Sequence, residues 1–201
     1  MTEMNKMILA TKNAGKLKEF QAFLAPHNIE VVSLADFDNV PEIIEDGTTF
    51  EENAAIKAKV ISEHFQLPVV AEDSGLMIDA LDGEPGVYSA RYAGDHDDAA
   101  NIAKVLEKLN GVSEAKRTAA FHTAIVAMKP NGDRLVAHGQ VDGLILEAER
   151  GEDGFGYDPI FFYPPYNKSF AELTTTEKNQ ISHRGRALQN FITELPTWWE
   201  V

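Results

Sequence analysis

The N-terminal part of the chain alternates short apolar runs with one amphipathic segment. Residues 7–10 form an apolar run of strand length, and residues 29–34 have the same character. Between them, apolar side chains recur at helical spacing on one face, at Leu17, Phe20, Phe23 and Leu24. The pattern therefore predicts a strand, a helix and a second strand.

The middle of the chain predicts a second helix followed by an interrupted strand. Thr49 and Glu52 have the spacing of a capping box, which predicts a helix start. The apolar face of this helix comprises Ala54, Ala58, Ile61 and Phe65. Residues 68–71 have the composition of a buried strand, the polar residues 72–75 interrupt it, and residues 76–81 resume it. We therefore expect an acidic turn between two strand segments.

The C-terminal half predicts a third helix, a hairpin and a last helix. The third helix occupies residues 97–111, with its apolar positions at helical spacing. Residues 121–128 and 134–141 flank a turn that contains Pro, Asn and Gly, which predicts an antiparallel hairpin. Residues 177–195 predict a last helix that ends before Pro196. Strands that alternate with helices, together with one hairpin, predict an α/β fold with a mixed sheet.

Length and composition are those of an ordinary globular protein. The chain has 201 residues, which favours one domain over residues 1–201, with room for two lobes around a shared core. A chain of this length buries roughly 70% of its unfolded surface and needs no covalent staple to fold. Hydrophobic residues make up 44% and charged residues 25%, which is not a disordered composition.

The chain contains no cysteine, which excludes a disulfide framework, a thiolate zinc site and a cysteine nucleophile. Residues 1–7 lack the long apolar core of a secretory signal. No apolar run approaches the roughly 18 residues that are needed to cross a bilayer. We therefore expect a cytoplasmic protein with no membrane partner.

The charge balance is strongly acidic. Lys and Arg together number 18 and Asp and Glu 32, for a formal net charge of -14. Such a surface repels a polyanion over long range, which argues against nucleic acid as a partner. Phosphates can still bind to an acidic protein where a few cations and a divalent metal are focused at one place.

The polar segment between the first predicted strand and helix is the first candidate site. It consists of Thr11, Lys12, Asn13, Ala14, Gly15 and Lys16. A helix N-terminus presents free amide donors to a phosphate, Gly15 allows close backbone approach, and Lys16 supplies a positive charge. The segment is not a Walker A loop, because Ala10 and Leu17 stand where that motif has Gly and Ser or Thr. A polar turn without function is the alternative.

The acidic turn in the middle of the chain is the second candidate site. Glu72 and Asp73 follow an apolar strand, and ligands collect at the carboxyl ends of strands in open α/β sheets. Magnesium prefers carboxylate oxygens, and one carboxylate beside it could deprotonate water as a general base. The carboxylates that could join Asp73 at the metal are Glu42, Glu45, Asp46 and Glu72. An acidic turn of no function is the alternative.

An aromatic turn is the third candidate. Phe155 lies between Gly154 and Gly156, so that its ring could be exposed to stack on a purine. Asp158 could accept a hydrogen bond from a base or a sugar. The alternative is a turn packed on the core.

Residues 83–92 form a separate Gly/Pro turn. For this turn a structural role is at least as strongly indicated as substrate contact.

Cations on the last predicted helix are the fourth candidate. Lys178 and Ser182 are four residues apart and share a helical face, and His183 and Arg184 project near them. Lys and Arg side chains that converge on a base would distinguish oxygen acceptors from amino donors. Solvated cations without function are the alternative.

In their combination and order, these segments closely resemble the inosine triphosphate pyrophosphatase family, whose bacterial members are XTP/dITP diphosphatases. The matching stretches are TKNAGK (11–16), GTTFEENAAIKA (47–58), AEDSGL (71–76), GEPGVYSARYAG (83–94), GFGYDPIF (154–161), AEL (171–173) and EKNQISHRG (177–185). The resemblance therefore covers nearly the whole chain.

The resemblance implies an elongated mixed β-sheet flanked by helices, in two lobes with the active site in the cleft between them. It implies that residues 11–16 grip the phosphates, with Lys16 as the main charge and Lys57 near them. Glu45 and Asp73 would hold Mg²⁺, and Asp73 would accept the proton of the attacking water.

The resemblance also implies a set of residues that contact the rest of the substrate. Ser74 would touch the nucleotide directly. The residues implied at the base are Phe155, Gly156, Tyr157, Asp158, Lys178, His183 and Arg184. Of these, the three on the last predicted helix would close over the base and read its 6-oxo group.

The activity that the resemblance implies is hydrolysis of ITP, dITP and XTP to the monophosphate and pyrophosphate, by a homodimer that clears deaminated purine nucleotides. A related septum-inhibitor-type nucleotide pyrophosphatase is one alternative, although its Ser- and Arg-rich opening motif is missing. A nucleotide-binding sensor without hydrolysis is another, and it need not keep Glu45, Glu72 and Asp73. A nucleotide kinase is disfavoured, because the Walker A loop is absent.

Overall fold

The computed structural model describes residues 6–199, so most of the segment 1–7, for which no secretory signal is predicted, lies outside the described part. The chain forms two compact units. The first unit comprises Met1–Asp73, Ala124–His138 and Ala187–Val201, and the second comprises Ser74–Thr123 and Gly139–Arg186. Each unit is therefore built from segments that lie far apart in the sequence.

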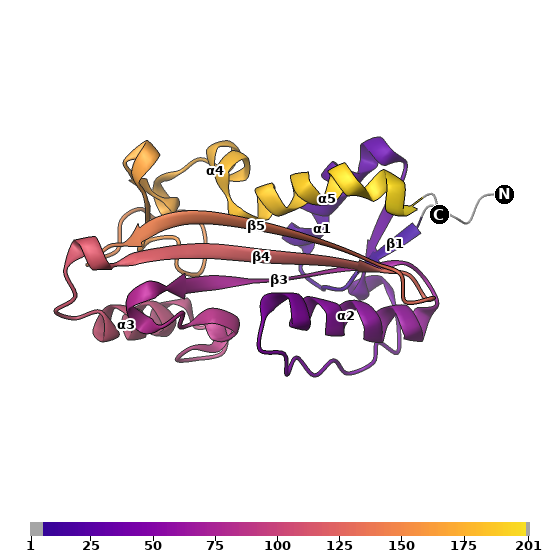
Figure 1. Cartoon of the computed structure of the whole chain (residues 1–201), viewed down its shortest axis with the longest axis horizontal. Coiled ribbons are helices and arrows are strands. Elements are labelled where there is room, and N and C mark those ends of the chain that lie inside the picture. Colours follow the sequence, from indigo (N-terminus) through magenta and orange to yellow (C-terminus); the bar gives the residue numbers. More distant parts are fainter. Residues whose placement is uncertain (1–5, 200–201) are drawn as a thin grey trace. The chain divides into compact units, whose positions relative to one another are not determined.

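Within residues 6–199, seven strands form a mixed sheet in the order β2-β1-β3-β4-β5-β6-β7, of which Figure 1 labels β1, β3, β4 and β5. They are β1 (Lys6–Leu9), β2 (Glu30–Ser33), β3 (Val69–Ile78), β4 (Thr118–Met128), β5 (Arg134–Ile145), β6 (Phe161–Tyr163) and β7 (Lys168–Ser169). Strand β1 is parallel to β2 and β3, whereas β6 is antiparallel to β5 and β7. Strands β4 and β5 are neighbours joined by the turn at residues 129–133. The predicted α/β fold with a mixed sheet and a hairpin is confirmed.

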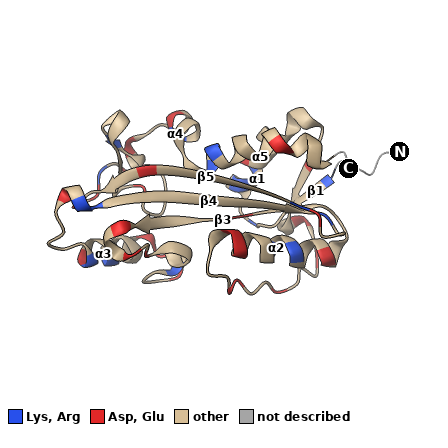
Figure 2. Ribbon diagram, viewed as in Figure 1, with Lys and Arg blue, Asp and Glu red and all other residues tan. Residues whose placement is uncertain are grey.

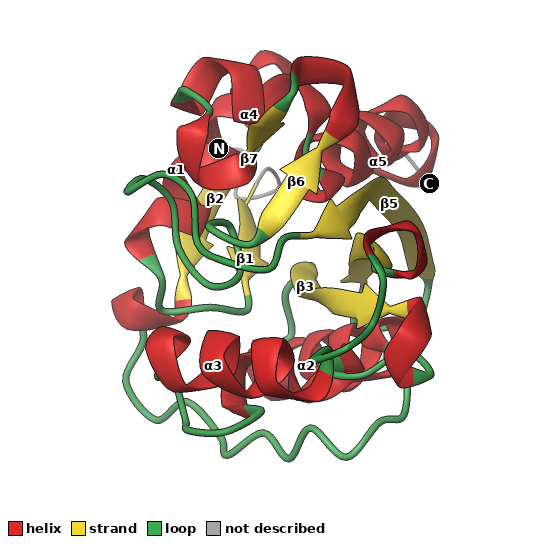
Figure 3. Cartoon of the chain, turned by 90° about the vertical axis from the view of Figure 1, so that its left-hand side faces the viewer, coloured by secondary structure: helices red, strands yellow, loops and turns green. Residues whose placement is uncertain are grey.

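Five α-helices accompany the sheet in the described part of the chain, and Figure 3 shows them in red. They are α1 (Ala14–Leu24), α2 (Phe50–Phe65), α3 (Asp98–Lys108), α4 (Thr175–Ile181) and α5 (His183–Trp199). The predicted capping box of α2 is confirmed, because Thr49 and Glu52 exchange side-chain and backbone hydrogen bonds. No helix within residues 6–199 has the length and apolar character to span a bilayer.

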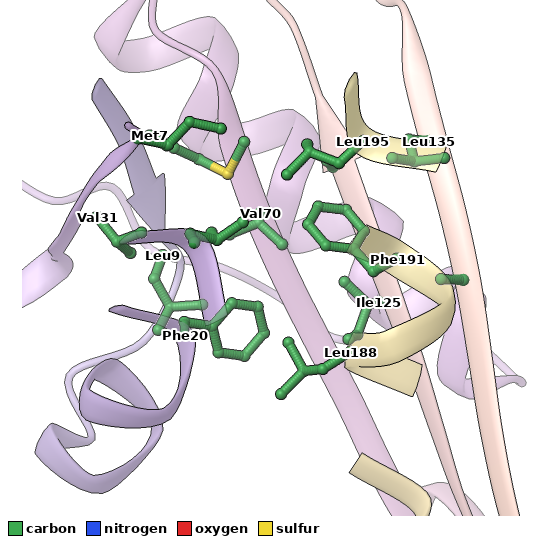
Figure 4. Packing of buried hydrophobic residues seen from close by; sticks show 14 of the residues in the cluster. Met7, Leu9, Phe20, Val31, Val70, Ile125, Leu135, Leu188, Phe191 and Leu195 are labelled. Carbon is green, nitrogen blue, oxygen red and sulfur yellow. The ribbon is translucent and has the colours of Figure 1, made fainter. Parts of the chain in front are cut away.

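In the first unit, successive residues of β3 face two different cores. Val70 packs in a cluster with residues of β1, α1 and α5, including Met7, Leu9, Phe20, Leu188 and Phe191 (Figure 4). Val69 and Ala71 pack in a second cluster with the apolar face of α2. Side chains of a strand alternate between its faces, so α1 and α5 cover one face of β3 here and α2 covers the other.

The second unit has its own core. Residues of the later part of β3 and of α3 pack there with an aromatic group from β4, β6 and the segment after β7, including Leu76, Ile102, Val105, Phe121, Phe161 and Phe170. The three phenylalanine rings contact one another, with centroid separations from 4.5 to 5.8 Å.

The predicted interruption of the third strand is wrong. Strand β3 runs without a break from Val69 to Ile78, so Glu72 and Asp73 lie inside the strand and not in a turn after it. The two carboxylates are tolerated there because each has a partner on its own face of the sheet, Lys16 for Glu72 and Asn53 for Asp73. Polar side chains alone therefore did not end the strand.

The predicted single last helix is also wrong, since α4 and α5 are separated at Ser182. Ser182 has an extended backbone (φ -65, ψ 155), its N–H donates to the carbonyl of Lys178, and its Oγ accepts from the N–H of Gly185. A Cβ on Gly185 would lie 2.2 Å from the carbonyl oxygen of Asn179, so this tight junction needs glycine. Ser182 therefore ends one helix and caps the next, and it does not share a helical face with Lys178.

The predicted end of the last helix before Pro196 is wrong as well. Pro196 lies inside α5, which continues to Trp199. Proline at this place removes only one hydrogen bond of the final turn, and Trp198 and Trp199 pack against the core cluster of the first unit. That packing accounts for the continuation of the helix.

Candidate active site

The turn between β1 and α1 is held by Asn13. Its Oδ1 accepts hydrogen bonds from the N–H groups of Gly15 at 2.8 Å and Lys16 at 3.1 Å, and its own N–H donates to Thr11 Oγ1 at 3.2 Å. The residues of the turn that are exposed are Lys12, Asn13, Ala14 and Gly15. The predicted strand-to-helix turn is confirmed, but Asn13 already occupies two of the amides that were expected to face a phosphate. Side chains, Lys16 above all, are therefore the groups of this turn that remain available to a ligand.

Lys16 pairs with the buried Glu72. Its Nζ lies 2.8 Å from Glu72 Oε1, and the Glu72 side chain is only 2% exposed against 28% for Lys16. A buried carboxylate needs a charged or hydrogen-bonding partner. Glu72 therefore anchors the Lys16 ammonium, while the Lys16 side chain stays partly exposed.

Asp73 faces α2 on the opposite side of β3. Asn53 Nδ2 donates to Asp73 Oδ2 at 3.2 Å, and Lys57 Nζ lies 3.8 Å from Asp73 Oδ1. The same ammonium donates to Glu45 Oε2 at 2.8 Å. Glu45 lies in the loop that precedes α2, where Figure 2 shows several acidic residues in red. The predicted pair, Glu45 and Asp73, therefore shares one cation, the Lys57 ammonium.

The alternation of side chains along β3 bears on the role of Glu72. Because Glu72 and Asp73 point to opposite faces, Glu72 pairs with α1 and does not join Asp73 beside α2. Within residues 6–199 no group of three or more His, Asp or Glu side chains is arranged to hold a metal ion. The predicted metal ligands Glu45 and Asp73 are brought together as a pair of carboxylates that share Lys57.

These two carboxylates fit a magnesium ion in chemical terms. Magnesium takes oxygen ligands and is usually held by one or two carboxylates, with waters and substrate phosphates completing its shell. Glu45 and Asp73 already share a positive charge, the Lys57 ammonium, and their side chains are 35% and 19% exposed. Both carboxylates are therefore accessible to a cation and to water.

In the second unit, the turn around Phe155 presents an exposed ring. Gly154 and Gly156 have positive φ values of 85° and 60°, and Phe155 is 62% exposed. Asp158 is 3% exposed, and its Oδ2 accepts from the N–H of Phe155 at 3.0 Å and from Lys178. A Cβ on Gly154 would lie 2.2 Å from Asp158 Oδ2, so the turn closes only with glycine there. The predicted exposure of Phe155 is confirmed.

Lys178 approaches the Phe155 ring. Its Nζ lies 4.4 Å from the ring centroid while it pairs with Asp158. A cation over an aromatic face is attracted to it. The sequence analysis predicted that Asp158 accepts a hydrogen bond from a base or a sugar. In the structure its carboxylate binds the N–H of Phe155 and the Lys178 ammonium.

Tyr157 is the buried residue that supports the turn around Phe155. It is 5% exposed, its hydroxyl donates to the carbonyl of Ser89 at 2.7 Å, and burial raises its pKa. Ser89 Oγ in turn accepts from the N–H of Leu76 at 2.9 Å and donates to the carbonyl of Gly86 at 2.6 Å. These bonds give the segment 83–92 the structural role that the sequence indicated, and they connect it with β3.

A second anchor holds the same turn from α3. Asp98, in the first turn of that helix, accepts a hydrogen bond from the N–H of Gly156 at 2.7 Å. Both ends of the exposed Phe155 are therefore tied by carboxylates, Asp158 on its own N–H and Asp98 on the following residue.

The remaining predicted residues lie in β3 and at the start of α5. Ser74 is half-buried in β3, directly after Asp73. His183 is 9% exposed and stacks on Phe121, with ring centroids 4.9 Å apart and planes at 18°. Arg184 follows it in the first turn of α5 and is partly exposed. The stacking fixes the His183 ring.

The chain matches the Ham1 family over residues 7–194. It is 58% identical over 199 residues to a dITP/XTP pyrophosphatase of Lactiplantibacillus plantarum, covering 99% of this chain and 98% of that protein. The chain belongs to the Ham1 family. A dITP/XTP pyrophosphatase of Geobacillus kaustophilus is 52% identical over 198 residues, with 98% of this chain and 95% of that protein covered.

Solved structures agree with this Ham1 assignment. A HAM1 protein from Coxiella burnetii superimposes with a TM-score of 0.91 and 45% identity, covering 96% of this chain and all of that one (100%). A nucleoside-triphosphatase, dITP/XTP pyrophosphatase, from Mycobacterium abscessus gives a TM-score of 0.81 and 42% identity over 92% of this chain and 96% of its own. The family resemblance inferred from the motifs is confirmed.

Three residues of this Ham1 chain were missed by the sequence analysis. Asn53 lies four residues before Lys57, and this helical spacing on the face toward Asp73 was a usable signal. Asp98 and Ser89 act on a turn that is far away in sequence. No local pattern identifies such partners.

Proposed function

We propose that this chain hydrolyses dITP, XTP and ITP to the nucleoside monophosphate and pyrophosphate. The observation that carries the proposal is the pairing of Glu45 and Asp73 through Lys57. Two carboxylates and a lysine beside a solvent-accessible position are the groups that metal-assisted attack on a phosphate requires. Relatives over nearly the full chain are named dITP/XTP pyrophosphatases, which supports this choice of substrate.

Separate groups of residues bind the triphosphate and the base in this proposal. The triphosphate is bound by the side chains of the 11–16 turn and by Lys57, and Ser74 contacts it from β3. The base is bound by the residues around Phe155. The three positive charges of Lys12, Lys16 and Lys57 offset part of the negative charge of the triphosphate.

Glu45 and Asp73 would hold the magnesium ion in this proposal, and the ion would supply positive charge against the phosphate and acidify water at this place. The protein's part is to keep the two carboxylates together and accessible.

Asp73 accepts the proton of the attacking water. The water oxygen forms a bond to the α-phosphorus, the bond between that phosphorus and the oxygen bridging to the β-phosphorus breaks, and pyrophosphate leaves. Lys16 and Lys57 offset the charge that develops on the phosphate oxygens. Glu72 keeps Lys16 oriented and does not touch the substrate.

The base is read by stacking and by hydrogen-bond donors. Phe155 stacks on the purine, while Lys178, His183 and Arg184 donate to the 6-oxo oxygen of hypoxanthine or xanthine. Adenine presents an amino donor at the same place, and each unmet buried donor costs about 1–3 kcal/mol. Gly156, Tyr157 and Asp158 shape the turn that carries the ring.

The cytoplasmic location and the homodimer are part of the proposal. The absence of cysteine fits a reducing cytosol, and the resemblance stated above implies the homodimer. Both stay predictions.

A panel of triphosphates tests the proposed activity. The purified chain is assayed with dITP, ITP, XTP, dATP and dGTP, with Mg²⁺ and with EDTA. We expect release of pyrophosphate from the first three, strong discrimination against dATP, and no release in EDTA. Binding of dITP by calorimetry without turnover in Mg²⁺ would instead support a nucleotide sensor.

A further inference from the structure

Asn53 is a fully buried amide beside the proposed water-activating group. It lies in the first turns of α2 and is 1% exposed. Its Nδ2 donates to Asp73 Oδ2 at 3.2 Å, and its Oδ1 accepts from the N–H of Gly47 at 2.9 Å. Because an amide has separate donor and acceptor ends, the two contacts fix its orientation. The nitrogen must face the carboxylate and the oxygen must face the backbone.

The contact with Gly47 anchors the loop that carries Glu45. A Cβ on Gly47 would lie 2.7 Å from Asn53 Oδ1 and 2.8 Å from Glu52 Cβ, so the loop reaches α2 this closely only with glycine. Glu45 is two residues away from this anchor. One buried side chain therefore contacts Asp73 directly and holds the loop that supplies Glu45.

We propose that Asn53 is a positioning residue, which sets the orientation of the Asp73 carboxylate and the place of the Glu45 loop. The inference rests on the proposed function of Asp73. The hydrogen bond from Asn53 to Oδ2 restricts rotation of the Asp73 carboxylate, whose Oδ1 lies 3.8 Å from Lys57 Nζ. Groups that orient metal-binding carboxylates in this way commonly change metal affinity or activity by about 10–100-fold when they are removed.

Two substitutions separate the two contacts of Asn53. Asn53→Asp keeps an oxygen acceptor for the N–H of Gly47 but replaces the donor toward Asp73 with a second acceptor. Asn53→Leu has a similar volume and removes both contacts. If orientation of Asp73 is what matters, both variants lose kcat and need more Mg²⁺, whereas the KM for dITP changes little.

A matched control is Asn101, which is also buried in a helix, at 2% exposure. It accepts hydrogen bonds from the N–H groups of Ala93 and Gly94 and makes no contact with Asp73. Asn101→Leu reports the cost of removing a buried amide in general. We expect it to lower the unfolding temperature without raising the Mg²⁺ requirement.

The experiment measures kcat, KM for dITP, the Mg²⁺ concentration for half-maximal activity and, by calorimetry without substrate, the Kd of Mg²⁺ in five proteins: wild type, Asn53→Asp, Asn53→Leu, Asn101→Leu and Asp73→Asn. All are assayed well below their unfolding temperatures. We expect about a 10–100-fold loss of kcat or rise in Mg²⁺ requirement in both Asn53 variants, and a larger loss in Asp73→Asn.

The outcomes distinguish this inference from the proposed function. If Asp73→Asn is inactive while Asn53→Asp keeps wild-type kcat and Mg²⁺ dependence, Asn53 does not orient Asp73, and the inference alone fails. If Asp73→Asn turns over dITP at the wild-type rate, the proposed role of Asp73 fails and the inference with it. An equal rise in Mg²⁺ requirement in Asn101→Leu would reduce the effect to general destabilisation and overturn the inference.

Discussion

Glu72 and Asp73 are neighbours in β3, and their carboxylates point to opposite faces of the sheet within the first unit. Glu72 Oε1 lies 2.8 Å from Lys16 Nζ of α1, whereas Asp73 Oδ2 accepts a hydrogen bond from Asn53 of α2 at 3.2 Å. This arrangement follows from the alternation of side chains along any strand. An acidic pair in the sequence thus separates into a partner for Lys16, the proposed phosphate-binding lysine, and the proposed acceptor of a proton.

Glu72→Gln tests that separation. The substitution removes the charge that anchors Lys16, so we expect kcat/KM for dITP to fall roughly 10-fold or more. The Mg²⁺ concentration for half-maximal activity should stay at its wild-type value. Glu45→Gln is the contrasting variant, since it should raise that concentration. Suppose that Glu72→Gln raises the Mg²⁺ requirement but leaves kcat/KM at saturating metal unchanged. Glu72 would then act at the metal, which would contradict its assignment as the partner of Lys16.

Phe155→Ala tests the stacking surface. Loss of one base–aromatic stack costs about 1–3 kcal/mol, so we expect the KM for dITP to rise about 10–100-fold with a smaller change in kcat. Steady-state kinetics with dITP measures both values. Tyr166, which is also an exposed aromatic at 40%, is the control, and Tyr166→Ala should leave KM unchanged. Equal KM values for wild type and Phe155→Ala would remove the ring from the base site.

Asp98→Ala tests the support of the same turn. The Asp98 carboxylate holds the N–H of Gly156 at 2.7 Å, so its loss should loosen the turn and raise the KM for dITP about 3–10-fold. Since Asp98 acts through Phe155, the double variant Phe155→Ala, Asp98→Ala should be little worse than Phe155→Ala alone. Fully additive effects on KM would show that Asp98 acts independently of the ring.

The pH dependence of stability follows from three capping-box glutamates. The pKa of Glu52 is lowered by the hydroxyl of Thr48, that of Glu177 by the N–H of Thr174, and that of Glu172 by the N–H of Ser169. A carboxyl with a lowered folded-state pKa contributes stability fully above its unfolded pKa of 4.5, and this stability is lost as the pH falls through the folded pKa.

The unfolding temperature should therefore decline as the pH falls below about 4.5. Differential scanning calorimetry from pH 7 to pH 3 measures this decline. Glu52→Gln should unfold at a lower temperature than wild type at pH 7, and the difference should narrow as the pH falls below 4.5. A constant difference at all pH values would mean that the ionised carboxylate of Glu52 adds nothing.

Local patterns along the sequence predicted most of the fold. The apolar spacing around Phe20 and the capping box at Thr49 and Glu52 each gave a helix that the structure contains. These predictions succeeded because the signals involve residues within a few positions of one another. The break at residues 72–75 failed for the opposite reason, since Lys16 and Asn53, which stabilise the two carboxylates inside β3, are distant in sequence.

Predictions for the candidate site divide in the same way. The exposed Phe155 and the turn at residues 11–16 were predicted from local composition, and the structure contains both. The junction at Ser182 was missed because it depends on the close approach of Gly185 to Asn179, which no periodicity reveals. The relation of Glu45 to Asp73 came only from family resemblance, because Lys57 joins two segments that the sequence separates.

The most direct test of the proposed reaction is hydrolysis of dITP in water labelled with ¹⁸O, in the presence of Mg²⁺, with the products analysed by mass spectrometry. Attack of water on the α-phosphorus should give dIMP that carries one ¹⁸O atom and pyrophosphate that carries none. Labelled pyrophosphate with unlabelled dIMP would place the attack on the β-phosphorus, and dIDP with orthophosphate would mean that a different bond is cut; either result would contradict the proposed mechanism.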